Sequence, residues 1–380
     1  MYKEIVDFIQ DLYGTREFIP LHEPRFIGKE KEYLIDCVDS TFVSSVGRYV
    51  NEFENRICEF TGAKFAIATM NGTAALHTAL ILANVEEGDV VITQALCFIA
   101  TSNAISYQKA VPLYIDVDKE TLGLSPDKLE SYLKENAVMK EDGFCYHRSL
   151  NKRIKACVPM HTFGHPVKLD ELILICSRFN IVLIEDAAES LGSTYKNVQT
   201  GLKGKVGAYS FNGNKTITCG GGGIVVTNDE QLGKRAKHIT TTARVPHNWE
   251  FIHDEIGYNY RLPNLNAALA CAQMENLELF VTRKRELAVK YKSFFENKGF
   301  SFVNEPVNCK SNYWLNAILL ENRKERDGFL EYMNSNKVMT RPVWTLMSRL
   351  PMFKDCPKDQ LENSTWIEDR LVNIPSSVIL

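Results

Sequence analysis

Short apolar runs alternate with helical patterns between about residues 55 and 230, and this alternation constrains the fold more than any other feature. Such alternation is typical of βαβ units, in which crossover helices join parallel strands. The runs are rich in Val and Ile and show little polar alternation, as expected for strands buried on both faces. We therefore expect an α/β fold with a mostly parallel sheet between helices. Its candidate strands are residues 89–93, 111–117, 154–160, 181–186, 208–212 and 223–228.

The chain changes character after Thr240. Residues 241–264 are predicted to form a long irregular loop, and loops of this length are usually functional. A helical pattern then runs from Asn264 to about Asn297, and short strand candidates at 314–320 and 339–344 follow it. A chain of 380 residues is expected to form two domains.

We expect a large domain over residues 1–250, with an N-terminal helical segment, and an interdomain helix with a smaller C-terminal α/β domain over 251–380. The polar stretch 134–153 is expected to be an insertion or a surface hairpin.

Charge and cysteine content exclude several classes of protein. The formal net charge is −3 and no dense run of Lys and Arg occurs, so we expect no nucleic-acid or anionic-membrane partner. The ten cysteines include no C-x-x-C pair, and no His pair completes a zinc pattern, so we expect reduced thiols and no metal site. Neither an export signal nor a bilayer-spanning stretch is visible, and we expect a soluble, cytoplasmic protein.

The segment NGTAAL, Asn71–Leu76, is a candidate phosphate site. It follows the apolar run 65–69 and opens a helical pattern. Gly72 allows a sharp turn, and a helix N-terminus offers free N–H groups to an anion. An ordinary glycine turn with Thr73 as the N-cap would give the same pattern.

Asp186 ends the apolar run 181–186. Sites in parallel α/β sheets gather at the carboxyl ends of strands, and a carboxylate there can keep a pyridine nitrogen protonated. The residue could equally cap the next turn or bind Mg²⁺. Its position alone leaves these alternatives open.

Lys215 lies in SFNGNKT, just after a predicted strand and before Gly220–Gly223. A lysine amine that is partly desolvated in a cleft can attack a carbonyl, although most lysines are solvated surface charges. A fourth motif, IGYNYRLPN around Asn259, lies inside the predicted loop and could also be a polar linker. Each motif is weak alone, but Lys215 follows Asp186 by 29 residues, and the order of the four is informative.

In this order and spacing the chain resembles the DegT/DnrJ/EryC1/StrS sugar aminotransferases, along nearly its whole length. Four segments carry the resemblance: GRYVNEFENRICEFTGAKFAIATMNGTAALHTAL, EDAAESLGS, SFNGNKTITCGGGG and GYNYRLPNLNAAL. Further segments resemble the LegC-type members most closely: FIPLHEPRF, STFVSSVG, MHTFGHP, SNYWLNAILL, VMTRPVW and NIPSS. The resemblance implies a fold-type I transferase that uses pyridoxal 5′-phosphate (PLP) and has a seven-stranded sheet in its large domain.

The resemblance also implies a reaction. LegC-type enzymes aminate C4 of a UDP-linked 2-acetamido-4-keto-2,6-dideoxyhexose, with L-glutamate as donor and 2-oxoglutarate released. Their products enter bacillosamine- or legionaminic-acid-type surface sugars. A dTDP-linked keto-sugar or a pseudaminic-acid precursor remains an open alternative.

The resemblance assigns roles to several residues. Lys215 would bond to PLP as a Schiff base and later move a proton, and Asp186 would pair with the pyridine nitrogen. Glu189 stands near the ring hydroxyl, where many relatives have Gln, and Phe98 would stack on the ring.

Other assignments concern the phosphate and the sugar nucleotide. The resemblance implies that Asn259 reaches the phosphate from a neighbouring subunit, and therefore implies a homodimer with shared active sites. Within the chain the phosphate would be held by Gly72, Thr73, Ala74 and Ser210. Candidates for the sugar-nucleotide pocket are Arg25, His165, Arg244, Tyr313, Trp314 and Arg341.

Other functions fit the sequence less well. A phosphate-binding P-loop fails because Asn214 separates Gly213 from Lys215, and a nicotinamide dehydrogenase fails because no G-x-G-x-x-G occurs. Some relatives dehydrate the sugar and have His in place of the lysine, whereas this chain has Lys215. A non-catalytic sugar-nucleotide sensor would be expected to lack Asp186 or Lys215, and both are present.

Overall fold

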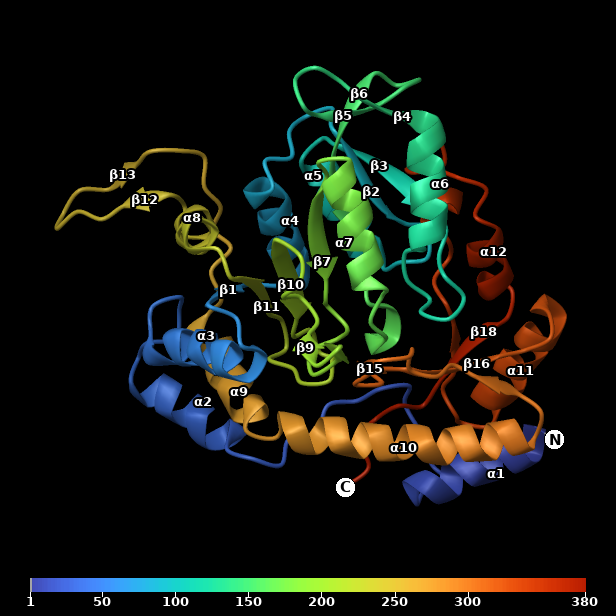
Figure 1. The fold of residues 1–380 in the computed structure, drawn as a ribbon. Coiled ribbons are helices and arrows are strands. Elements are labelled where there is room, and N and C mark those ends of the chain that lie inside the picture. The colour runs from blue at the N-terminus through green and yellow to red at the C-terminus, as the bar shows by residue number, and fades with distance from the viewer. Residues whose placement is uncertain (1) are drawn as a thin grey trace.

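The computed structural model describes residues 2–380 and contains a central, mostly parallel sheet (Figure 1). Seven strands form its main path in the order β1-β11-β10-β7-β6-β2-β3. The pairs β10–β7, β7–β6, β6–β2 and β2–β3 are parallel, and β11 is antiparallel to both β1 and β10. This arrangement confirms the expected fold class. The strands are β1 (Phe65–Thr69), β2 (Val90–Gln94), β3 (Val111–Ile115), β6 (Lys152–Val158), β7 (Val182–Asp186), β10 (Val206–Ser210) and β11 (Gly223–Thr227).

Apolar side chains on both faces of these strands are covered by helices, which explains why their sequences lack polar alternation. One face packs against α4 (Gly72–Leu82), α5 (Ile99–Tyr107) and α8 (Glu230–Thr240). The opposite face packs against α6 (Pro126–Asn136) and α7 (Leu169–Arg178) at one end, and against α3 (Arg48–Thr61) and α9 (Asn264–Met274) at the other.

The predicted insertion at 134–153 is a hairpin. Its strands β4 (Ala137–Met139) and β5 (Cys145–His147) pair antiparallel, and β5 pairs with the start of β6.

A second, four-stranded antiparallel sheet has the order β14-β16-β18-β17. It is formed by β14 (Ser301–Phe302), β16 (Asn316–Leu319), β17 (Arg341–Pro342) and β18 (Leu371–Ile374). The helices α1 (Tyr2–Tyr13), α10 (Leu277–Asn297) and α11 (Arg323–Ser335) share an apolar cluster with this sheet. The N-terminal helix α1 therefore lies beside α10, with Phe8 stacked on Phe294 at 3.7 Å between ring centroids (Figure 1). The expected domain boundary at residues 250 and 251 stays a prediction.

The helix expected over 264–297 is broken into α9 and α10 at Glu275 and Asn276. The Glu275 side chain accepts hydrogen bonds from Tyr33 at 2.5 Å and Arg56 at 3.0 Å, which fixes the break against α2 (Glu30–Asp39) and α3. The change of direction lets α9 pack against the sheet while α10 runs to the C-terminal unit.

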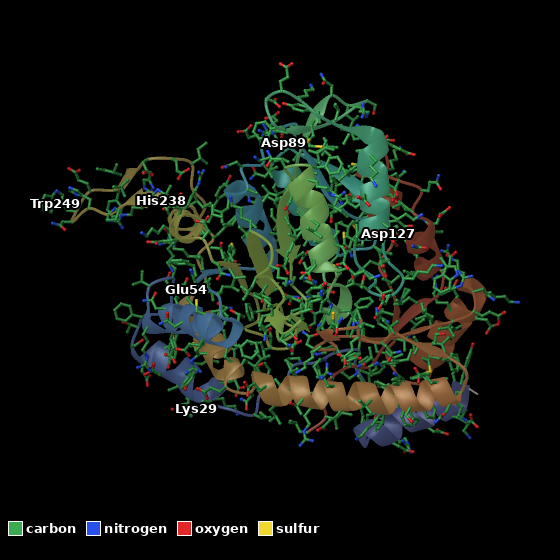
Figure 2. All side chains as sticks on the ribbon, viewed as in Figure 1. Lys29, Glu54, Asp89, Asp127, His238 and Trp249 are labelled. Atoms are coloured by element: carbon green, nitrogen blue, oxygen red, sulfur yellow. The ribbon has the colours of Figure 1, made fainter. Side chains whose placement is uncertain are left out.

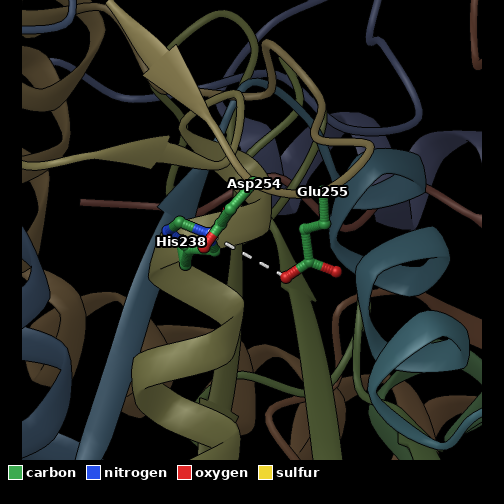
Figure 3. A group of neighbouring side chains, drawn as sticks. All are labelled: His238, Asp254 and Glu255. Carbon is green, nitrogen blue, oxygen red and sulfur yellow. Dashed lines mark hydrogen bonds and ion pairs between the residues drawn. The ribbon is translucent and has the colours of Figure 1, made fainter.

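The expected irregular loop contains a two-stranded hairpin, β12 (Arg244–Val245) and β13 (Ile252–His253). This hairpin, residues 244–256, projects away from the central sheet, and Trp249 lies at its far end (Figures 1 and 2). At its base His238 Nε2 of α8 lies 2.6 Å from Asp254 Oδ1 and 3.9 Å from Glu255 Oε1 (Figure 3). These three partly or fully exposed groups fasten the hairpin to α8.

The remaining elements are short connections. They are β8 (Thr194–Tyr195), β9 (Val198–Gln199), β15 (Cys309–Lys310), α12 (Glu362–Glu368) and the 3₁₀ turns Thr162–Gly164 and Met347–Arg349. Among residues 2–380, no helix is long and apolar enough to cross a membrane.

Candidate active site

A cavity of about 400 Å³ lies at the carboxyl ends of β7 and β10 and the N-terminus of α4. It brings together three of the four sequence motifs, whose lining residues are up to 144 positions apart in the chain. Its lining consists of Asn71, Gly72, Thr73, Leu76, Phe98, Ala100, Met160, Asp186, Ala188, Glu189, Ser210, Asn212, Asn214, Lys215, Trp314 and Trp344.

Asp186, the last residue of β7, is buried at one wall of this cavity. Its Oδ2 accepts a hydrogen bond from Thr101 Oγ1 at 2.6 Å, and its Oδ1 accepts one from Ala188 N at 3.1 Å. Burial raises the pKa of the Asp186 carboxyl, while Thr101, Ala188 and the Lys215 ammonium act in the opposite direction. The carboxylate is thus held in one orientation by neutral donors, and no cation among residues 2–380 forms an ion pair with it.

Lys215 is held by contacts from distant parts of the chain. Its Nζ lies 3.4 Å from Glu189 Oε1 and 3.8 Å from the centroid of the Trp314 ring. The indole Nε1 of Trp314 donates to the carbonyl oxygen of Asn214 at 2.6 Å, so one aromatic residue fixes both the lysine and its loop. The Lys215 side chain is 12% exposed and lines the cavity.

Glu189 is buried on the other side of Lys215. Its Oε2 accepts a hydrogen bond from Phe163 N at 2.9 Å. Burial raises the pKa of Glu189 to about 7, although Lys215 and the Phe163 N–H lower it. A carboxyl group that changes charge near neutral pH therefore borders the amine.

The N-terminus of α4 forms an anion cradle. Asn71 is the N-cap, and its side chain accepts from Ala74 N at 2.8 Å. That bond leaves the N–H groups of Gly72 and Thr73 without an acceptor among residues 2–380. A Cβ at Gly72 would lie 2.8 Å from the Cβ of Ser210, so only glycine lets the helix approach β10 this closely.

Some of the other candidate residues line the cavity, and others lie outside it. Phe98 lines the cavity and meets Trp344 edge to face at 6.2 Å. Ala74 does not line the cavity, and its N–H is already bonded to Asn71. Asn259 is exposed at the base of the hairpin, where Arg261 Nε donates to its side chain at 3.2 Å, and Arg244 lies on the hairpin itself.

Of the sugar-nucleotide candidates, only Trp314 reaches the cavity. Arg25 bonds Val378 O, and the exposed Arg341 bonds Asn334 and Thr340. His165 is fully buried, packs edge to face against Tyr313 at 5.3 Å, and is kept neutral because burial lowers its pKa to about 4. A role for Arg25, His165, Tyr313 or Arg341 in binding sugar nucleotide stays a prediction.

Comparison with known proteins supports the motif-based resemblance. The sequence pattern of the DegT/DnrJ/EryC1/StrS aminotransferase family matches residues 25–380. The chain belongs to this family. It is 36% identical to the GDP-perosamine synthase of Escherichia coli O157:H7, over 95% of this chain and 93% of that protein. It is 32% identical to the GDP-perosamine synthase of Vibrio cholerae, over 94% of each.

A solved structure shares the fold of this DegT/DnrJ/EryC1/StrS family member. Helicobacter pylori PseC, described as an aminotransferase involved in the biosynthesis of pseudoaminic acid, superposes with a TM-score of 0.84 over 94% of both chains at 21% identity. The family member described here is accordingly a PLP-dependent sugar aminotransferase, and the expected enzyme class and cofactor are confirmed.

The cavity of this family member fits PLP chemically. Its wall offers an amine for the cofactor's carbonyl carbon and a buried carboxylate for its ring nitrogen. The α4 N-terminus offers two free N–H groups for its phosphate, and Phe98, Trp314 and Trp344 offer aromatic surface for its ring.

Sequence reasoning missed several residues of the site. Thr101, Met160 and Trp344 were not expected there, although Thr101 bonds Asp186 and the other two line the cavity. Thr101 lies three residues after Phe98 on the same helix start, and this spacing could have indicated a shared face.

Proposed function

We propose that this enzyme transfers an amino group from L-glutamate to C4 of a UDP-linked 2-acetamido-4-keto-2,6-dideoxyhexose and releases 2-oxoglutarate. The observation that carries the proposal is the buried arrangement of Lys215, Asp186 and the α4 N-terminus around one cavity. The LegC-like segments, three of which contribute Met160, Trp314 and Trp344 to the cavity, support the UDP-sugar. The enzyme would act in the cytoplasm, and its product would be used for a bacillosamine- or legionaminic-acid-type surface glycan.

Within this reaction the chain's own residues have separate tasks. When bound, PLP supplies an electron sink that stabilises negative charge on the carbon that loses a proton. Asp186 would keep the ring nitrogen protonated through its charge. Lys215 would hold the cofactor, and its Nζ would carry the proton between the two reacting carbons.

The remaining residues of the cavity bind the cofactor and orient its groups and the amine of Lys215. The N–H groups of Gly72 and Thr73 and the Ser210 hydroxyl bind the phosphate dianion, aided by the positive end of the α4 dipole. Phe98 and Trp344, which line the cavity, would offer aromatic surface to the ring and exclude water. Trp314 keeps the amine of Lys215 directed into the cavity.

We also propose that the enzyme works as a homodimer. Asn259 is exposed and lies outside the cavity of its own chain, so it could bind phosphate only in the cavity of a second copy. A dimer with a two-fold axis would complete both sites in the same way.

A GDP-linked keto-sugar is a second candidate substrate, because three relatives above 30% identity are named GDP-perosamine synthase. The test is to incubate the PLP-loaded enzyme with L-glutamate and a panel of UDP-, GDP- and dTDP-linked 4-keto-6-deoxy sugars. Mass spectrometry and NMR of the product, together with 2-oxoglutarate release, identify the substrate. Preferential amination of the UDP-linked acetamido sugar supports the proposal, and preference for another nucleotide overturns it.

A further inference from the structure

His77 of α4 is a buried histidine whose two ring nitrogens are both hydrogen-bonded. Its Nδ1 lies 2.9 Å from the hydroxyl of Tyr260, and its Nε2 lies 2.6 Å from Nε2 of Gln108, the C-cap of α5. A neutral imidazole has one donor and one acceptor, and each has a partner here. Because burial lowers the pKa of His77 to about 4, the ring is neutral at physiological pH. The position and the plane of the ring are therefore fixed.

Two tyrosines, one on each side of Asn259, pack against this histidine. The rings of Tyr258 and Tyr260 meet the imidazole edge to face, at 5.0 and 5.8 Å between centroids, and they stack on each other at 5.0 Å. The backbone is extended here, since Asn259 and Arg261 each form an antiparallel β-bridge. Side chains of an extended segment alternate between its two faces. Tyr258 and Tyr260 thus face α4, and Asn259 faces the opposite side.

The backbone of Tyr260 is also bonded to the turn that precedes the anion cradle. Met70 N donates to the Tyr260 carbonyl oxygen at 2.8 Å, and the next residue, Asn71, is the N-cap of α4. His77 follows Gly72 by five residues on the same helix. Tyr260 is therefore held at its carbonyl by the turn before α4 and at its hydroxyl by α4 itself.

We propose that His77 is a positioning residue for the cofactor site of the partner subunit: through Tyr260 it holds Asn259 in the conformation that reaches the PLP phosphate there. A side chain that is ordered before binding loses less conformational freedom when it binds, which raises affinity. This inference rests on the proposed dimer and the proposed role of Asn259. It adds the group that orders Asn259, a group that lies outside the cavity lining of its own chain.

The first test measures PLP affinity in single variants. His77→Phe keeps an aromatic ring and Tyr260→Phe keeps the other, but each removes the hydrogen bond between them. Each should weaken PLP affinity by about fivefold, as expected for one lost hydrogen bond, and the double variant should lose little more. His77→Asn should restore much of the affinity, because its amide can take the place of Nδ1. His147→Phe is the matched control: His147 is also buried and bonds a tyrosine hydroxyl, that of Tyr132 at 2.8 Å, outside the cavity lining.

Mixed dimers, purified through two different tags, decide whether the effect crosses between subunits. One subunit carries Lys215→Ala, so borohydride can fix PLP only on Lys215 of the partner subunit. The fixed PLP, measured by absorbance over a range of PLP concentrations, gives the affinity of that one site. With His77→Phe in the Lys215→Ala subunit, that site receives Asn259 from the altered chain, and its affinity should fall by about fivefold. With His77→Phe in the subunit that keeps Lys215, the affinity should equal that of the mixed dimer with His77 in both subunits.

Two results would overturn the inference. One is a loss of affinity that follows the subunit with Lys215, because His77 would then only support α4 within its own chain. The other is unchanged affinity in both arrangements. If His77→Phe does not fold, Tyr260→Phe takes its place in the same mixed dimers, since it removes only a hydroxyl from a half-buried side chain.

Asn259→Ala separates this failure from failure of the proposed function. If Asn259→Ala retains PLP as wild type does, the proposed shared site fails. If Asn259→Ala loses PLP affinity while His77→Phe and Tyr260→Phe keep it, only the positioning role of His77 is rejected.

Discussion

The cofactor cavity and the β12–β13 hairpin are built in opposite ways. In the cavity each functional group is fixed by a residue from another part of the same chain, as Thr101 fixes Asp186 and Trp314 fixes the Lys215 loop. On the hairpin, Trp249 is 74% and Ile256 85% exposed, and contacts are local. One region is held together by contacts between distant parts of the chain, and the other presents apolar side chains that the chain does not bury.

This difference indicates where a second copy would act. Neighbouring exposed apolar side chains on a projecting segment are typical of an interaction surface. Asn259, at the base of the hairpin, is the residue proposed to serve the other subunit. Catalytic geometry would then be set inside each chain, whereas completion of the phosphate site would depend on association.

The largest expected effect tests whether Lys215, inside the cavity, is needed for the reaction. Lys215→Ala should lower transamination by about 10³-fold or more, because it removes both the attachment point and the proton carrier. Rates with L-glutamate and borohydride trapping of PLP measure this. Lys205→Ala, on the exposed loop before β10, should behave as wild type. Turnover by Lys215→Ala near the wild-type rate would show that another group moves the proton.

The next effect tests the hairpin. Trp249→Ser combined with Phe251→Ser should weaken self-association by about tenfold or more, since large aromatic side chains dominate interface energies. Sedimentation measured over a range of concentrations reports association, and PLP retention should fall with it. The thermal unfolding of the isolated chain should change little, because both side chains are at least 74% exposed. Unchanged association would place the interface elsewhere.

A smaller effect concerns the support of Asp186. Thr101→Val keeps the shape but removes the 2.6 Å hydrogen bond, so kcat/KM should fall by about tenfold. The pKa of Asp186 should also rise, because Thr101 lowers it, and the acid side of the pH–rate profile should move to higher pH. Ser106→Ala, on the same helix, is the control. An unshifted acid limb would contradict this support role.

The smallest expected effect concerns stability and its dependence on pH. Lys284 of α10 is fully buried and donates to the carbonyls of Trp314 at 3.1 Å and Ser376 at 2.5 Å. Burial lowers its pKa to about 7, against about 10.4 in an unfolded chain. Between these values the folded state binds fewer protons, so this residue makes stability rise with pH.

Lys284→Met should therefore show a flatter rise in unfolding free energy between pH 7 and 9, by up to about 1.4 kcal/mol per pH unit. Urea unfolding at several pH values measures the slope. Parallel curves for wild type and Lys284→Met would show that the amine stays charged in its two carbonyl contacts.

Much of the large sheet and part of the site could be predicted from the sequence. The strands are recognisable because Val and Ile face helices on both sides, and Asp186 and Lys215 end up in one cavity because both follow neighbouring strands. The contact between Trp314 and Lys215 was not predicted, and the expected role of Trp314 in binding the nucleotide stays a prediction. That contact joins residues about 100 positions apart, and no local pattern encodes it.

The break between α9 and α10 was missed for a related reason. Residues 264–297 have a continuous helical pattern, and the chain turns only because Glu275 is bonded by Tyr33 and Arg56 from α2 and α3. The hairpin was missed because its paired strands have two residues each, too few to show an alternating pattern.

The packing of α1 has a consequence for synthesis of the chain. Ile5, Val6 and Ile9 are synthesised before α10, α11 and β18, against which they are buried. While the residues between them are being made, this apolar face lacks its native partners and is open to chaperones or to incorrect association. The central sheet can therefore form before the unit that contains α1, which can close only after β18 has been synthesised.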